Sequence, residues 1–154
     1  MNDVTETVSV EPVVLHLDVP ADSSYSVLLR AALAALAARH GFTLDRIEDL
    51  RLAGTEAFGL VVLRARSDAT IHITVTSTTD AIEVRATAPS VESRAHAGGP
   101  GSLGWTLLTS LVDQLAEVEH DGEPGVWLSI RSDQASPVPP RAAPLSPSDE
   151  SARG

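Results

Sequence analysis

One acidic side chain lies in the middle of an otherwise apolar helical stretch. Residues 54–63 read GTEAFGLVVL, and Glu56 is the only charged residue among them. A carboxylate fixed on such a helix can serve as a catalytic base, provided that it lies within hydrogen-bond reach of the proton that it removes. Glu56 can equally be a solvated residue on a plain structural helix. The residues alone leave both interpretations open.

Glycines gather directly before another predicted helix. Residues 98–104 read GGPGSLG, and an apolar stretch with helical spacing follows them. Backbone N–H groups at the N-terminus of a helix can hold a phosphate. Glycine-rich loops before helices are common, however, and on this observation alone we favour a structural loop. The glycines close a long segment, 88–101, which has no periodicity and is of the type that carries function or disorder.

Other kinds of chemistry find little support in the chain. The histidines fall in separate predicted elements without the spacing or carboxylate neighbours of a metal site, so we expect no metal and interpret them as solvated or strand-face residues. Nucleophile-elbow, P-loop and dinucleotide-binding motifs are absent, and without cysteine the chain has no disulfide or thiolate chemistry. The histidines are His16, His40, His72, His96 and His120.

Charge narrows the range of partners. Acidic residues outnumber basic ones by 21 to 11, which gives a formal net charge of −10. Neutralisation of phosphates has no obvious source in such a chain, so we expect no nucleic-acid partner. An acidic surface can steer a basic protein partner or merely keep a protein soluble, and both interpretations stand. Because neither a signal peptide nor a membrane-spanning apolar run is visible, the sequence predicts a cytoplasmic protein without a membrane partner.

The hydrophobic periodicity predicts an alternation of strands and helices. The order strand, helix, helix, hairpin, helix, hairpin is typical of an α+β two-layer sandwich, in which a mixed or antiparallel sheet carries its helices on one face. The expected elements are a strand at 13–19, helices at 25–40, 45–62 and 102–115, a hairpin of strands at 69–76 and 81–86, and a final hairpin of strands at 115–120 and 126–131.

The second predicted helix carries its own signals. Asp45, followed three residues later by Glu48, resembles a capping box at the start of this helix. Gly54 and Gly59 lie inside it, and each costs a helix about 1 kcal/mol relative to alanine. Two interior glycines indicate that a ligand approaches the helix closely, or that the helix packs tightly against a sheet.

The two ends of the chain differ from its middle. Residues 1–11 are polar and acidic, and residues 134–154 hold five of the ten prolines with little to bury. We therefore expect both ends to be disordered and the folded domain to span 12–133. The sequence gives no reason to assign a function to the tail.

Three stretches resemble the GHKL ATPase superfamily, and within it the small RsbW-like and SpoIIAB-like anti-sigma factors that double as serine kinases. Residues 44–62 are similar to the helix that carries the N box of this family, and residues 81–89 to the strand before its first glycine box. Residues 101–130 resemble the second glycine box, its helix and the closing hairpin. The segment 103–113, LGWTLLTSLVD, is the most specific match.

The resemblance implies functional roles for some residues, while at other positions the functional residue of the family is absent. Glu56 matches the general base of the kinases, and Gly101, Gly104 and Thr106 stand at positions that meet the nucleotide phosphates in the family. Four residues after the base the family has an asparagine that holds Mg²⁺, whereas this chain has Leu60. A leucine offers no oxygen to a hard cation. Because the other matched stretches agree in register, we favour Glu56 as a relic of a base over a plain fold residue.

Further substitutions affect the nucleotide contacts that the resemblance implies. Ala86 and Ala88 occupy the positions of the aspartate and glycine of the first glycine box, so the acceptor for the adenine amino group is absent. The lid arginine is replaced near Pro100, while Trp105 is most simply interpreted as core filling. Phosphoryl transfer depends on positioning and electrostatic stabilisation, much of it supplied by the metal. We therefore expect no cofactor and no turnover at a useful rate.

The resemblance implies a regulatory binding protein that sequesters a sigma factor or a related regulator, with weak or no ATP binding. A STAS-type anti-anti-sigma protein would release it, and a homodimer could form through the edge strand that contains Val13, Leu15 and Leu17. The alternative is an active ATP- and Mg²⁺-dependent protein serine kinase that acts on a STAS-domain partner, with Glu48, Asp49 or Glu56 near the metal. A third alternative is a shared fold with an unrelated role.

Overall fold

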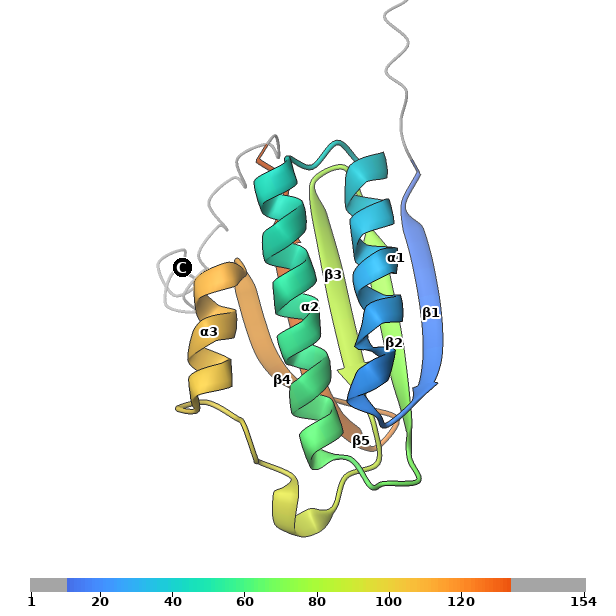
Figure 1. Ribbon diagram of the computed structural model, residues 1–154, viewed down its shortest axis with the longest axis vertical. Coiled ribbons are helices and arrows are strands. Elements are labelled where there is room, and N and C mark those ends of the chain that lie inside the picture. Colours follow the sequence, from blue (N-terminus) through green and yellow to red (C-terminus); the bar gives the residue numbers. More distant parts are fainter. Residues whose placement is uncertain (1–10, 134–154) are drawn as a thin grey trace, which may run out of the picture.

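Residues 11–133 are described by the computed structural model, and within this range five strands form one sheet. The elements are β1 (Val13–Pro20), α1 (Ser26–Arg39), α2 (Leu44–Arg64), β2 (Thr70–Ser77), β3 (Ala81–Thr87), α3 (Leu103–Leu111), β4 (Gln114–His120) and β5 (Glu123–Arg131). The strands lie in the order β1-β2-β3-β5-β4, and each neighbouring pair is antiparallel. Figure 1 shows the three α-helices on one face of the sheet. The α+β two-layer sandwich is therefore confirmed. The disorder expected at 1–11 and 134–154 concerns residues that, apart from Glu11, lie outside the described range.

Helix α1 begins after a short 3₁₀ turn, Ser23–Tyr25, rather than directly at its polar cap residues. The side chain of Asp22 caps this turn by accepting a hydrogen bond of 2.8 Å from the backbone N–H of Ser24. At the other end Gly41 takes a φ of +74°, a left-handed conformation that glycine adopts without strain and that commonly ends helices. The end signal in the sequence is thus confirmed, while the cap serves the turn.

The predicted capping box of α2 is wrong. Thr43 is the N-cap residue, and its hydroxyl accepts from the N–H of Arg46 at 3.4 Å. Asp45 lies inside the first turn, and the carboxylate of Glu48 contacts Arg51 at 2.6 Å instead of reaching back to the cap. Thr43 stands directly before the first helical residue, so its hydroxyl can satisfy a free N–H group of the first turn as well as an aspartate would.

The two interior glycines of α2 have different surroundings. A Cβ atom at Gly54 would collide with Cδ1 of Leu33, whereas one at Gly59 would meet nothing within 4 Å. Gly54 therefore permits close packing, and the neighbour is α1 rather than the predicted sheet or ligand. Gly59 has no such neighbour among the described residues, which leaves no packing reason for it.

Helix α3 is shorter than predicted. It ends at Leu111, and Val112 already has extended backbone angles of φ −117° and ψ 159°. The N–H of Asp113 then donates to the carbonyl of Ser129 at 3.0 Å, which brings the chain onto β5. Leu115, predicted as the last helical residue, is thus a β4 residue, because pairing with β5 outweighs the continuing helical pattern.

Both predicted hairpins are present, with a correction to the second turn. Strands β4 and β5 are joined by the two residues Asp121 and Gly122, with φ angles of 53° and 78°, so 123–125 belong to β5 and not to the turn. Gly125 is needed where it lies, because a Cβ atom there would collide with the carbonyl oxygen of Ala86 on β3. At this position β5 therefore lies very close to β3, the central strand of the sheet.

Candidate functional site

The carboxylate of Glu56 points toward the first turn of α3. A Cβ atom at Gly104 would lie 3.9 Å from Oε2 of Glu56 and 3.5 Å from Cδ2 of Leu60. Glu56 is half-buried and Leu60 is buried. The fold thus brings together Glu56 and Gly104, which the sequence places 48 positions apart, by packing the middle of α2 against the start of α3.

The other two residues predicted to meet phosphates are engaged differently. Gly101 is exposed, has a φ of +93° and precedes the N-cap residue Ser102, whose hydroxyl accepts from the N–H of Trp105 at 3.1 Å. The hydroxyl of Thr106 donates to the carbonyl of Ser102 at 3.0 Å. The hydroxyl groups of Ser102 and Thr106 are thus used within the turn, while Trp105 packs partly buried against the core, as predicted.

Leu60 fills the space between α2, α3 and the preceding loop. A Cβ atom at Gly98 would collide with Cδ2 of Leu60, and this atom lies near Gly104 as well. Only 7% of Leu60 is exposed, so a purely apolar side chain occupies the position that the family resemblance gives to a magnesium ligand. Apolar carbon supplies no donor to a cation that demands oxygen, and the residues here do not fit Mg²⁺.

The positions that would hold adenine are equally apolar. Ala86 and Ala88 are 1% and 2% exposed, and neither side chain can accept a hydrogen bond from an amino group. The N–H of Ala88 is already used, because it donates to the carbonyl of Pro124 at 3.2 Å. Pro100, where the lid cation is missing, is exposed. These residues do not fit the polar edge of the nucleotide.

Sequence reasoning missed a buried ion pair at this end of α2. Arg64 is 3% exposed; its Nε donates to the carbonyl of Ala97 at 2.7 Å and its Nη2 to Oε1 of Glu117 at 2.8 Å. Arg64 lies one helical turn beyond Leu60 and two beyond Glu56 on the same helix face, which was the available signal. A buried charge requires such partners, because an unpaired one carries a large desolvation penalty.

Hydrogen bonds hold the 88–101 segment against the C-terminal end of α2. The N–H of Val91 donates to the carbonyl of Arg64 at 2.9 Å, and the N–H of Arg66 donates to the carbonyl of Pro89 at 3.0 Å. Together with the bond from Arg64 to Ala97, these contacts hold the segment along the C-terminal end of the helix. At Gly98 the segment also reaches Leu60, since a Cβ atom there would collide with Cδ2 of that side chain.

The carboxylates named for the kinase alternative do not form a metal site in the described part of the chain. Glu48 contacts Arg51 at 2.6 Å, and Asp49 contacts Arg46 at 3.7 Å, so each has a cationic neighbour on its own helix. Between residues 11 and 133 no group of three or more histidine, aspartate or glutamate side chains is arranged to hold a metal ion. Glu56 is thus not part of such a group within this range.

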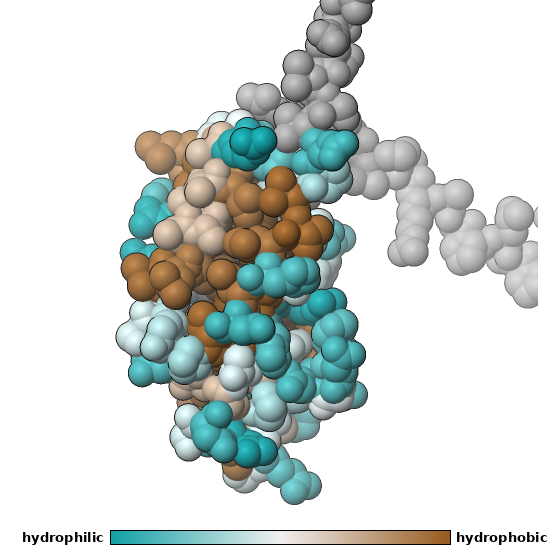
Figure 2. Space-filling view, turned by 90° about the vertical axis from the view of Figure 1, so that its right-hand side faces the viewer, coloured by the Kyte–Doolittle hydropathy of each residue, from teal (hydrophilic) through white to brown (hydrophobic). Residues whose placement is uncertain are grey.

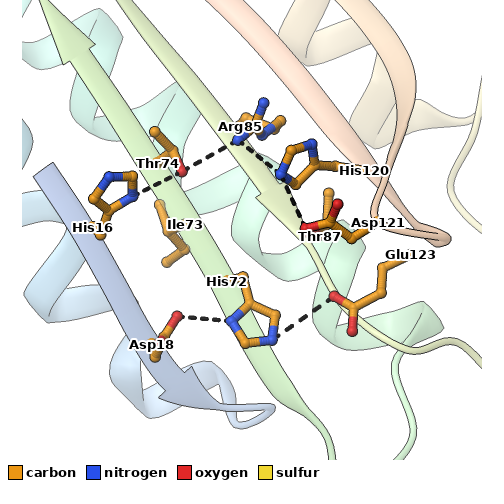
Figure 3. Close-up of a pocket in the computed structure, with 10 residues that line it drawn as sticks. All are labelled: His16, Asp18, His72, Ile73, Thr74, Arg85, Thr87, His120, Asp121 and Glu123. Atoms are coloured by element: carbon orange, nitrogen blue, oxygen red, sulfur yellow. Dashed lines mark hydrogen bonds and ion pairs between the residues drawn. The ribbon is translucent and has the colours of Figure 1, made fainter. Parts of the chain in front are cut away.

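The histidines were correctly interpreted as strand-face residues in three cases, but they are not isolated. His16, His72 and His120 come together on the face of the sheet that carries no helix (Figure 3). His40 is instead buried, and neither of its ring nitrogens has a hydrogen-bond partner among the described residues. Burial, with a smaller contribution from the charge of Arg39, lowers the pKa of His40 below its ordinary value.

The fold and the matched stretches agree with a known protein family. The family model of the histidine kinase-like ATPase domain matches residues 19–132. The chain belongs to this family. Its site must therefore be compared with those of working nucleotide-binding relatives, and the apolar residues described above mark where it differs from the family pattern.

Several relatives are about a third identical to the chain over the aligned residues. The anti-sigma-F factor RsbW of Mycobacterium tuberculosis is 32% identical over 117 residues, which are 75% of this chain and 68% of that protein. The serine-protein kinases RsbW of Listeria monocytogenes and Listeria innocua are each 31% identical over 127 residues, 70% of this chain and 81% of theirs. None of the helices within residues 11–133 is both long and apolar enough to cross a membrane.

Proposed function

We propose that this histidine kinase-like ATPase domain is an anti-sigma-factor-like regulator, which binds a sigma factor or a related regulator with weak or no binding of ATP. Relatives named anti-sigma-F factor and serine-protein kinase support the first half of this proposal. The second half rests on one observation, the seating of Leu60 among Gly98 and Gly104 at the position of the magnesium ligand. The protein would act by occupying its partner rather than by transferring phosphate.

The energetics favour loss of turnover over loss of the fold. Removing one group that stabilises charge in a transition state costs about 3–4 kcal/mol, and the metal is a principal source of such stabilisation in phosphoryl transfer. Leu60 and Ala86, by contrast, are buried apolar residues that add to the core. The same substitutions therefore weaken nucleotide chemistry and preserve the surface that a protein partner would use.

The proposal includes partners and a location. A STAS-type anti-anti-sigma protein would compete with the sigma factor, and both would be met in the cytoplasm, where transcription takes place. A homodimer would use β1, which lies at the edge of the sheet. Val14 on this strand is 54% exposed, which leaves an apolar residue available at that edge.

Two measurements test the proposal. Calorimetry with ATP and with ADP, each with and without Mg²⁺, should give no detectable heat at millimolar nucleotide. Co-expression of the tagged chain with each sigma factor of the source organism should give one stable complex by native mass spectrometry. Tight, magnesium-dependent nucleotide binding would contradict the degenerate site, and a chain that forms no complex with any sigma factor would contradict the regulatory role.

The second candidate is an active protein serine kinase, and the position of Glu56 favours it. A half-buried carboxylate that faces Gly104 at the start of α3 has the placement of a base beside a phosphate-binding turn. The test is transfer of labelled phosphate from ATP to a serine of a STAS-domain protein. Labelling by the wild type and none by Glu56→Gln, with the exposed Glu119→Gln as the control, would establish the kinase and overturn the first candidate.

A further inference from the structure

The face of the sheet that carries no helices has a polar hollow of about 330 Å³. Its lining comes from β1, β2, β3 and the β4–β5 hairpin, so the hollow crosses the sheet (Figure 3). Because the pleat alternates side chains between the two faces, the polar residues of this lining point away from the helices and from the Glu56 region, whereas Ile73 is buried on the helix side. The hollow is therefore separate from the family's nucleotide site.

Arg85, near the middle of this face, has no ionic partner among residues 11–133. Its Nη2 donates to Oγ1 of Thr74 at 3.5 Å and contacts Nε2 of His120 at 3.4 Å, and neither group is a carboxylate. No carboxylate oxygen within the described range lies within 4.0 Å of its guanidinium, although Arg46, Arg51 and Arg64 each have one. Arg85 is half-buried and thus only partly hydrated. Such a cation retains most of its hydrogen-bonding capacity for a ligand.

Two imidazoles flank the guanidinium. On one side Nδ1 of His16 contacts Oγ1 of Thr74 at 3.2 Å, which joins His16 to the same hydroxyl that Arg85 uses. On the other side His120 connects Arg85 to the carboxylate of Asp121, 3.3 Å from Nε2. Figure 3 shows this chain of contacts running across the strands, with Arg85 between the two imidazoles.

Two of the three acidic side chains that line the hollow contact the third histidine. Nδ1 of His72 contacts Asp18 at 2.7 Å, and its Nε2 faces Glu123 at 3.8 Å. This group lies on the side of the hollow away from Arg85, as Figure 3 shows. Since no set of three such residues in the described range is arranged to hold a metal, a cation is not the expected occupant.

We infer that the open face of the sheet binds an oxyanion, a phosphate or carboxylate group, with Arg85 as its principal ligand and His16, His120 and Thr74 around it. The planar guanidinium presents paired N–H groups whose spacing matches two oxygens of a carboxylate or phosphate. The net charge of −10 and the nearby Asp121 oppose an anion, so binding is weak and depends on the local arginine.

The two tryptophans of the chain make the test specific. Trp127 pairs with Arg85 across β3 and β5 and lies on the open face, whereas Trp105 is in the first turn of α3. In ¹⁵N-labelled full-length protein, inorganic phosphate should shift the indole N–H signal of Trp127 and leave that of Trp105 in place, at ionic strength matched with sodium chloride. Acetate, added in the same way, separates carboxylate from phosphate recognition.

Three variants complete the experiment. Arg85→Gln should weaken phosphate binding about tenfold or more, because it removes a charge-assisted pair of hydrogen bonds. Asp121→Asn should tighten it severalfold, since asparagine keeps the left-handed turn and removes the opposing charge. Arg51→Gln removes one positive charge from α2, beside Glu48, and should leave the affinity unchanged.

Two results would overturn the inference. If phosphate shifts Trp105 and not Trp127, the anion binds at the start of α3, which would speak for a working nucleotide site and against the proposed function as well. If Arg85→Gln retains the affinity and a dispersed amide spectrum while Asp121→Asn gains none, Arg85 is not the ligand, and the regulatory role is unaffected. The two proposals therefore fail by different observations.

Discussion

The buried or half-buried arginines on the two faces of the sheet differ in their hydrogen-bond partners. On the helix-covered side Arg64 is 3% exposed and bonded to Glu117 and to the carbonyl of Ala97. On the open side Arg85 is half-buried, and within residues 11–133 its polar side-chain contacts are a hydroxyl and an imidazole. A cation whose donors bond within the protein stabilises the fold. A cation with unused donors can bind a ligand.

The largest effect is expected where the loop meets Leu60. Gly98→Ala should lower the free energy of unfolding by about 3 kcal/mol, since alanine at a φ of +68° is strained and its Cβ would collide with Leu60. Gly101→Ala is the matched control, because Gly101 also has a positive φ but an open surrounding; it should cost only about 1 kcal/mol. Urea unfolding measures both. Equal losses would mean that this region is not tightly filled.

The ion pair gives the next largest effect. Glu117→Ala should cost about 2 kcal/mol by urea unfolding, because it leaves the buried Arg64 charge without its partner. The loss is smaller than for a fully buried pair because the Glu117 side chain is 37% exposed. Glu119→Ala, an exposed acidic residue two positions along β4, should change stability by less than about 0.5 kcal/mol. If the two variants behave alike, Arg64 does not depend on this pair.

Because His40 is buried, the free energy of unfolding should depend on pH, and this effect arises on the helix-covered side of the sheet. Burial lowers the pKa of His40 below the ordinary 6.5, so the unfolded chain binds more protons than the folded one below that pH. The unfolding free energy should therefore fall as the pH drops through 6.5 and level off below the folded-state pKa. Urea unfolding at about pH 7.5 and about pH 5.5 should show a smaller drop for His40→Leu than for wild type. His96→Leu, at an exposed position, serves as control; equal drops in all three proteins would exclude His40 as the cause.

The smallest effect on stability is expected on the open face. Arg85→Gln should change the unfolding free energy by less than about 0.5 kcal/mol, because its contacts are long and its partners remain solvated. The same urea titration used for Glu117→Ala provides the comparison. A loss as large as that of Glu117→Ala would show that Arg85 is structural, and the contrast between the two faces would disappear.

Much of the fold could be predicted from the sequence because local patterns determine it. Alternation in β1 and β2, the 3.6-residue spacing of α1 and α2, and the end signal at Gly41 are properties of neighbouring residues. The error at the N-cap of α2 is local, whereas the error at the end of α3 depends on a distant residue. At Asp113 the bond to Ser129 ends α3 earlier than its apolar spacing indicates.

For the candidate site, residue types alone determined that Leu60 cannot bind a metal and that Ala86 cannot accept a hydrogen bond. Only the tertiary structure decided what fills the space instead. Arg64 and Glu117 are 53 positions apart and meet only because β4 is paired beside β5 under the end of α2. His16, His72 and His120 likewise meet only through strand pairing. Such contacts follow from the register of the sheet, which places side chains from distant segments on one face, and no local spacing encodes it.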